Sequence, residues 1–537
     1  MKLRKVIMLF TALLSQAVFG SGMTSQEVSR VLTQAISRAQ QIEPQAVIAV
    51  VDLEGFVLGV WRVDESRPRA TKLQIAALDA ITKAGTAAFL SSKQEALTSR
   101  TAGFIVQQHF PPGVSNRPNG PLVGVNFSNL SLSDVNRFKN PHKNYVADLT
   151  SGTNGAPIAA FPFTALSGLA GSPGGVPLYR AGKLIGGIGV AGRTVAPKIS
   201  PFSNLADIQV GQQLYDPDED VALAGQVGFE PRTTILGSNV FIDGIRIPYV
   251  AGATRLGKVQ PLGSVGKIFH PYKVVRSPSV KYMTGDFGGQ SCEVRSPILA
   301  DPMITTPVLN DPIDKQLRLT AADVRQILSQ ASARAKITRA GIRLPRGLAA
   351  QTFITVVNNP GFKNTPPTVL GTIRTPDATI FSWDVSIQKA RTAVFFSNDT
   401  RAFSTRTVGF LSQQFYPPGI ADTAPGPFYS LQEQFSLLPP KVLNPLNGVF
   451  LTNASALSKP NPSLPNGITI FPGGFPLYRK GLLIGAIGVS GDGIDQDDII
   501  SAAGTVGFEA PPSIRADRQL YRGARLPYAK FPRNPDL

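Results

Sequence analysis

The sequence contains two copies of one domain. Residues 173–192 (PGGVPLYRAGKLIGGIGVAG) and residues 472–491 (PGGFPLYRKGLLIGAIGVSG) differ at only five of twenty aligned positions. Other matched segments keep the same order along the chain, such as residues 100–113 with 406–419. The chain must therefore fold into two similar domains, copy one (24–249) and copy two (318–530). The connector between them, residues 250–317, has no partner in the repeat and is too rich in proline to be a third domain.

Each copy has the same predicted order of elements. Residues 24–39 and 320–335 begin with Thr-x-x-acid and carry apolar residues at helical spacing, which predicts a capped amphipathic helix. Two β-branched runs separated by a turn then predict a hairpin, and a helical pattern rich in small residues follows at 73–89 and 383–395. The Gly-rich segments at 173–192 and 472–491 predict a final pair of short strands.

The first twenty residues have the pattern of a signal peptide. Lys2, Arg4 and Lys5 precede a short apolar run, and small residues near Gly20 suit a signal peptidase. Because the apolar run is too short to span a bilayer, an uncleaved anchor is the less favoured alternative. No other transmembrane segment is expected, so the mature protein is predicted to be periplasmic or secreted. A single cysteine, Cys292, excludes an internal disulfide framework.

The protein is strongly basic, with a formal net charge of +18 that falls to +15 when the three bases of the signal peptide are removed. Such a charge favours anionic ligands or surfaces. Seven bases and no acid lie between Arg246 and Lys281, but they are spread along the connector with few aromatic residues. We therefore interpret them as a solvated surface, and export argues against a nucleic-acid partner.

One glycine-rich motif resembles a cofactor fingerprint. Gly187, Gly189 and Gly192 satisfy the G-x-G-x-x-G pattern of dinucleotide-binding proteins. A proline-containing loop follows where a helix is required, and Ala486 replaces the first glycine in copy two. We interpret the motif as a tight turn with close backbone packing. Nucleophile-elbow, Walker and zinc-protease motifs are absent, so the sequence leaves open whether the protein is an enzyme.

Histidine is scarce, which limits metal chemistry. The chain has only His109, His142 and His270, and residues 319–537 contain no His, Met or Cys. A zinc site present in both copies is therefore excluded. His109 stands where copy two has Phe415, so this position serves either as a metal ligand or simply as an aromatic ring.

Together these motifs resemble the GlcG/HbpS-like haem-binding (haem-degrading) family, over residues 24–230 and 320–509. The most specific part is the Gly-Gly-x-Pro-Leu segment followed by Ile-Gly-Val-x-Gly. The resemblance implies an α/β domain in which an antiparallel sheet is flanked by helices. Because relatives assemble as oligomers, we expect the two copies to pack as an internal pseudo-dimer, which could itself form homo-oligomers. The chain departs from the family in its fusion, its long insertions and its few histidines.

The resemblance implies an exported haem- or tetrapyrrole-binding protein that senses or scavenges its ligand in an apolar groove between helix and sheet. Haem iron is usually held by His, Met, Cys or Tyr, so His109 is the candidate ligand, with Tyr179 and Tyr478 as alternatives. Basic residues of both copies are available for the haem propionates or pair with acids of their own domain: Lys83, Arg100, Lys389 and Arg406.

Two other functional classes remain open. The first is an enzyme on a small anionic metabolite, using the same basic residues and an anion nest of backbone amides at Gly174, Gly175, Gly473 and Gly474. The second is a structural module that docks another exported protein. Uptake of haem, detected by its absorbance, separates haem binding from both.

Overall fold

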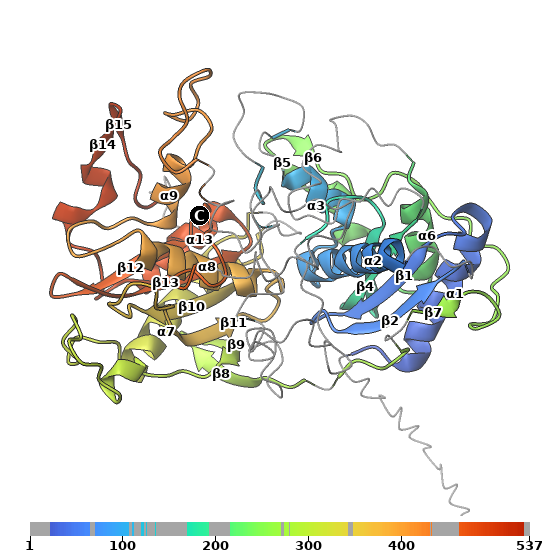
Figure 1. The fold of residues 1–537 in the computed structure, drawn as a ribbon, viewed down its shortest axis with the longest axis horizontal. Helices are drawn as coiled ribbons and strands as arrows, with labels where there is room; N and C mark the ends of the chain where they lie inside the picture. The colour runs from blue at the N-terminus through green and yellow to red at the C-terminus, as the bar shows by residue number, and fades with distance from the viewer. Residues whose placement is uncertain are drawn as a thin grey trace, which may run out of the picture.

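The computed structural model describes residues 22–64, 70–106, 110–111, 120–122, 125, 135, 169–192, 215–269, 273–278, 280–341, 347–429, 431 and 461–530. Figure 1 shows two α/β units side by side, one built from each copy. None of the described helices combines the length and apolarity needed to cross a bilayer. The predicted signal peptide lies outside the described residues.

Copy one is an antiparallel sheet with helices on both faces. The strand order is β3-β4-β1-β2-β7, and β7 comes from the connector. The helices are α1 (Ser25–Ile42), α2 (Ala70–Leu90), α3 (Ser99–Ile105) and α6 (Pro217–Gln226); the strands are β1 (Val47–Asp52), β2 (Val57–Arg62), β3 (Gly175–Arg180) and β4 (Lys183–Ala191), with a small hairpin of β5 (Phe241–Ile242) and β6 (Ile245–Arg246).

Copy two repeats this arrangement, with the strand order β12-β13-β10-β11-β9-β8. Its helices are α7 (Ala321–Ile337), α8 (Ser382–Phe395), α9 (Thr405–Leu411) and α13 (Ile494–Gly504); its strands are β10 (Thr352–Asn358), β11 (Val369–Arg374), β12 (Gly474–Arg479) and β13 (Leu482–Gly491), with a small hairpin of β14 (Leu520–Tyr521) and β15 (Ala524–Arg525). Capping boxes at Thr24 and Thr320 start α1 and α7, as the sequence predicts.

Side chains of β1 alternate between two helical layers because successive residues of a strand point to opposite faces. Ile48 and Val50 belong to the core beneath α1 and α6. Val47 and Ala49 belong to the core beneath α2. The predicted α/β fold, a sheet between helices, is thereby confirmed.

Two glycines of the dinucleotide-like motif, Gly187 and Gly189, lie inside β4 rather than in a turn, and Gly192 follows the end of this strand. A Cβ added to Gly189 would lie 2.0 Å from the carbonyl oxygen of Ala80, and one added to Gly187 would lie 2.3 Å from that of Ala84. In copy two, the equivalent distance is 1.9 Å, from Gly488 to the carbonyl oxygen of Ser386. The predicted close packing is correct, but the predicted turn is not, because these glycines let a helix backbone rest directly on a strand.

The connector supplies an edge strand to both sheets in succession. Its strand β7 (Lys267–Ile268) pairs with β2, and the chain after β7 continues along copy one until Ser277 N donates to Met23 O at 2.8 Å. The hairpin of β8 (Met283–Phe287) and β9 (Gln290–Ser296) then joins β11, and Asp301 N donates to Leu319 O at 2.8 Å. The connector is thus part of each domain's sheet.

The two copies are in direct contact, as expected of an internal pseudo-dimer. Arg295 on β9 forms a two-point ion pair with Glu54 of copy one, at 2.9 and 3.0 Å. Lys93 N donates to Asp377 Oδ1 at 3.1 Å. These contacts join the turn between β1 and β2 and the end of α2 to copy two.

Candidate functional site

A buried lysine occupies the same place in both copies, on the helix that covers the sheet. Lys83 Nζ lies 2.9 Å from Asp218 Oδ2 and 2.9 Å from Val190 O. Lys389 Nζ lies 2.8 Å from Asp497 Oδ2 and 2.7 Å from Val489 O. The repeated fold therefore brings together three segments: the middle of α2 or α8, the end of β4 or β13, and the start of α6 or α13.

The copies differ in the number of carboxylates around this lysine. In copy one, Asp79 lies one helical turn before Lys83, and its Oδ2 is 3.3 Å from Nζ. Copy two has Val385 at the equivalent position, four residues before Lys389. Lys83 thus has two carboxylates within ion-pair distance among the described residues, and Lys389 has one.

Burial and neighbouring charges shift the pKa values of these groups in opposite directions. Burial raises the pKa of Asp218 to about 7 and that of Asp497 to about 6, although the adjacent lysine opposes both shifts. Burial also lowers the pKa of Lys389, because Asp497 compensates it only in part. Around Lys83, the carboxylates outweigh the same burial effect and hold the pKa above its usual value.

The other predicted basic residues also pair with acids of their own copy. Arg100 forms a two-point pair with Glu219, at 2.8 and 3.1 Å. Arg406 contacts Asp498 at 2.8 Å and Asp495 at 2.6 Å. These pairs attach α3 to α6 and α9 to α13, which gives both arginines a structural role independent of any ligand.

Each of the two predicted tyrosines donates a hydrogen bond to a loop of its own copy. Tyr179 Oη donates to Ser92 O at 2.6 Å, and Tyr478 Oη donates to Asn398 O at 2.8 Å. Burial raises the pKa of both phenols, which disfavours the phenolate form that would bind iron. Neither tyrosine lines the pocket described below.

The Gly-Gly segments at 174–175 and 473–474 lie beside the buried lysines. The amides of Gly175 and Gly474 already donate hydrogen bonds to side chains of their own copy. Gly175 N donates to Ser99 Oγ at 2.8 Å, and Gly474 N donates to Thr405 Oγ1 at 2.9 Å. A Cβ added to Gly174 would lie 3.3 Å from Lys83 Nζ, and one added to Gly473 would lie 3.0 Å from Lys389 Nζ. These glycines give the buried ion pair room against the strand.

The groove that we expected between helix and sheet is closed. Helix α2 touches β4 through backbone atoms at Gly187 and Gly189, and α8 does the same at Gly488. A flat ligand cannot enter a contact with no side-chain layer. The predicted haem slot therefore does not lie at these three contacts.

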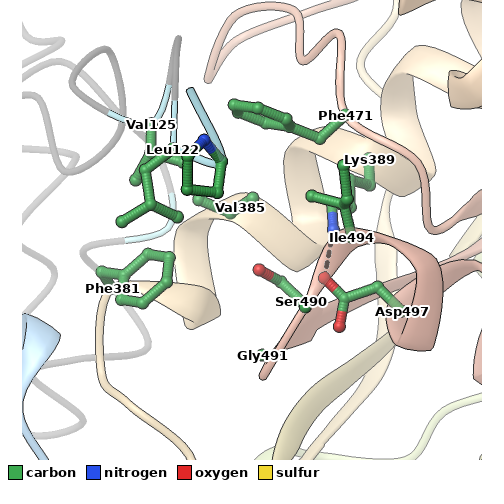
Figure 2. Close-up of a pocket in the computed structure, with 12 residues that line it drawn as sticks. Leu122, Val125, Phe381, Val385, Lys389, Phe471, Ser490, Gly491, Ile494 and Asp497 are labelled. Carbon is green, nitrogen blue, oxygen red and sulfur yellow. Dashed lines mark hydrogen bonds and ion pairs between the residues drawn. The ribbon is translucent and has the colours of Figure 1, made fainter. Parts of the chain in front are cut away.

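A pocket lies instead where copy one meets copy two (Figure 2). The pocket is shallow: its enclosed volume is about 30 Å³, and it reaches about 370 Å³ only when the open solvent space at its mouth is included. Leu122 and Val125 of copy one form one wall, and Phe381 and Phe471 of copy two contribute aromatic rings. Lys389, Ser490 and Asp497 provide its polar groups, and Figure 2 shows the dashed ion pair between the lysine and Asp497.

The predicted iron ligand, His109, lies outside the described residues, as do His142 and His270. Within the described part of the chain, no group of three or more His, Cys, Asp or Glu side chains is placed to hold a metal ion. The neighbour of His109, Phe110, is buried and packs edge-to-face on Phe104 with 5.6 Å between ring centroids.

The sequence did not single out several residues of the pocket and of the two lysine–aspartate pairs. Asp218 and Asp497 belong to the acidic segments that follow the Gly-rich strands. Their pairing with Lys83 and Lys389 became visible only in the folded structure. Ser490 and Val385 could have been found by comparing the repeats, since copy one has Ala191 and Asp79 at these positions.

The fold and site define a class of protein: a tandem α/β protein with a buried lysine–aspartate pair in each copy. The family described as "Haem degrading protein HbpS-like" matches residues 23–197 and 319–505. The chain therefore belongs to the HbpS-like family, with one family domain in each copy.

Solved structures with a similar fold include three relatives. PduOC in complex with heme is 24% identical and covers 36% of this chain and 98% of its own, with a TM-score of 0.22. Klebsiella pneumoniae ORFY is 17% identical (38% and 88% covered, TM-score 0.19), and a double mutant of Streptomyces reticuli HbpS is 18% identical (43% and 99%, 0.18). No curated protein sequence matches this chain.

Proposed function

We propose that this protein is an exported haem- or tetrapyrrole-binding protein that senses or scavenges its ligand. The observation that carries the proposal is membership of a haem-degrading family in both copies. The relative PduOC, whose structure contains heme, is consistent with it. The basic charge of the chain also suits a ligand with two propionates.

The described residues provide part of what haem needs. The pocket between the copies offers apolar and aromatic walls, together with Lys389 for a propionate. No described side chain is placed as an axial ligand: the described residues include no histidine, Cys292 is buried beside Ser332 at 3.5 Å, and the phenols of Tyr179 and Tyr478 donate to backbone carbonyls. We therefore propose that His109 supplies the iron ligand.

The absorbance spectrum of the protein purified from its native compartment tests haem binding directly. Titration of the full chain with haemin is expected to saturate at one haem per chain, because only copy one offers a histidine at this position. His109→Phe should abolish the low-spin Soret shift and leave the fold intact, since copy two already has Phe415 there.

Matched controls are His142→Phe and His270→Phe, which should leave the spectrum unchanged. Saturation at two haems per chain, or an unchanged spectrum in His109→Phe, would reject His109 as the ligand. An absence of any haem uptake at micromolar haemin would reject the function and favour the small-metabolite or docking alternatives. Export is tested by N-terminal sequencing of the mature protein, which should begin close to Ser21.

A further inference from the structure

The two copies have the same buried lysine, but its hydrogen-bond partners differ between them. Lys83 Nζ has three acceptors within reach: Val190 O, Asp218 Oδ2 and, at 3.3 Å, Asp79 Oδ2. An ammonium has three hydrogens, so this environment uses all of them. Lys389 has two acceptors among the described residues, Val489 O and Asp497 Oδ2.

The position at which Lys389 lacks a third acceptor lies at the wall of the pocket. Val385 replaces Asp79, and both Val385 and Lys389 line the pocket wall. Lys389 is 1% exposed and has two acceptors among the described residues, so its third hydrogen can be donated to a group in the pocket.

A second donor faces the same space. Ser490 is only 3% exposed and lines the pocket. Figure 2 shows this hydroxyl pointing into the space among the drawn residues, toward Phe381 and Val385. Copy one has Ala191 at this position, so the hydroxyl and the missing carboxylate occur together, in copy two.

We propose that this pocket binds the carboxylate of a ligand with a short apolar body. Lys389 Nζ and Ser490 Oγ donate to the carboxylate oxygens, which take the place that the Asp79 carboxylate holds in copy one. Phe381, Val385 and Leu122 contact the apolar body. In copy one, the equivalent position is occupied by the side chain of Asp79.

The surrounding charges define the ligand class further. In copy one, two carboxylates lie within ion-pair distance of one ammonium, Asp218 at 2.9 Å and Asp79 at 3.3 Å from Lys83 Nζ. Asp497 lies 2.8 Å from Lys389 Nζ, so one added monocarboxylate would reproduce this arrangement in copy two. A phosphate or a dicarboxylate would bring a third negative charge to this single ammonium in an apolar pocket, which is costly. The site therefore selects a monocarboxylate group over these anions.

The carboxylate has two chemical sources, a free short-chain acid or a propionate of haem. The inference does not depend on the proposed haem function, because the geometry of the site is the same for both sources. Separate titrations distinguish them: one with hexanoate, and one with haemin compared with haemin dimethyl ester, which lacks free carboxylates.

The test is calorimetric titration of the full-length mature protein with hexanoate, with neutral hexanamide as the control ligand. Hexanoate should bind and hexanamide should bind at least tenfold more weakly. Val385→Asp, which installs the residue of copy one, should weaken hexanoate binding at least thirtyfold because its carboxylate occupies the site. Val385→Thr has almost the same shape without charge and should stay within about threefold of wild type.

Ser490→Ala, also the residue of copy one, should weaken hexanoate binding about tenfold through loss of one hydrogen bond to a charged group. It leaves the fold undisturbed and so remains informative if Val385→Asp is unstable. If hexanoate does not bind but haemin does, the inference requires that the dimethyl ester and Ser490→Ala both weaken haemin binding. Equal binding of hexanoate and hexanamide, unchanged binding in both variants, or no binding of either probe would overturn it.

Discussion

At the scale of single residues, equivalent positions of the two copies carry different buried charges. Asp52 ends β1 in copy one and is buried, while its equivalent in copy two is Asn358. Asp52 accepts hydrogen bonds from the amides of Glu54 and Phe56 and so shapes the turn before β2. Burial nevertheless raises its pKa to about 7, with a further contribution from Glu54.

Asp52 should therefore make the protein less stable as the pH rises. Between about pH 4 and pH 7, the unfolded chain loses a proton that the folded chain retains, so the free energy of unfolding falls across this window. Asp52→Asn, the residue of copy two, removes this loss. Urea unfolding should show the variant more stable than wild type at pH 8 by up to about 4 kcal/mol.

The same measurement at about pH 3 is the control, where both proteins should agree within about 0.5 kcal/mol because the carboxyl is mostly protonated in both states. A stability difference that is equal at pH 3 and pH 8 would show that Asp52 acts through its hydrogen bonds alone.

At the scale of elements, the Gly-rich strands make close backbone contacts with a helix in each domain. Gly189 of β4 and Gly488 of β13 place a strand backbone against the backbone of α2 or α8. This contact fixes the height of the helix above the sheet and thereby positions the buried lysine over the end of the strand. The sequence predicted the close packing because a glycine inside an apolar strand often marks the place where another backbone approaches.

Gly189→Val and Gly488→Val should each destabilise the protein by at least about 1–3 kcal/mol, because the new side chain overpacks the core. Thermal unfolding measures the loss. Gly252→Val is the matched control: Gly252 is exposed, and its added Cβ would meet Tyr215 at an ordinary 3.6 Å. An unchanged melting temperature in both strand variants would contradict close helix–strand contact.

At the scale of the whole molecule, Arg295 joins the connector to both copies. Its guanidinium is buried, pairs with Glu54 of copy one and also contacts Glu293. It lies 3.8 Å from the ring centroid of Tyr282 and 5.0 Å from that of Trp383 in copy two. An arginine held between aromatic rings and acids of different domains couples those domains mechanically.

Arg295→Met should destabilise the protein by about 1–3 kcal/mol, because the partly buried Glu54 loses its partner while Glu293 keeps Arg374 at 3.2 Å. Calorimetry should then resolve two unfolding transitions where wild type has one. Arg325→Met removes an exposed arginine that lies over Phe287 at 4.7 Å, and it should cost less than about 1 kcal/mol. A single transition in Arg295→Met would show that other contacts couple the copies.

Local patterns in the sequence determined the domain count, the main elements and their order. Capping boxes, helical periodicity and β-branched runs act over a few residues, so the starts of α1 and α7 and both hairpins could be predicted without the fold. The duplication added independent support, because each pattern occurs twice. The connector strands were missed, since β7 and β9 become strands only through pairing with β2 and β11.

Tertiary structure decided what the candidate residues do. Lys83 and Asp218 are 135 residues apart, and Lys389 and Asp497 are 108 residues apart, so no local spacing reveals these pairs. The pocket needs both copies, because its walls come from Leu122 of copy one and Phe381 of copy two. Charge pairing and burial depend on which distant segments are packed together, and only the folded chain determines that.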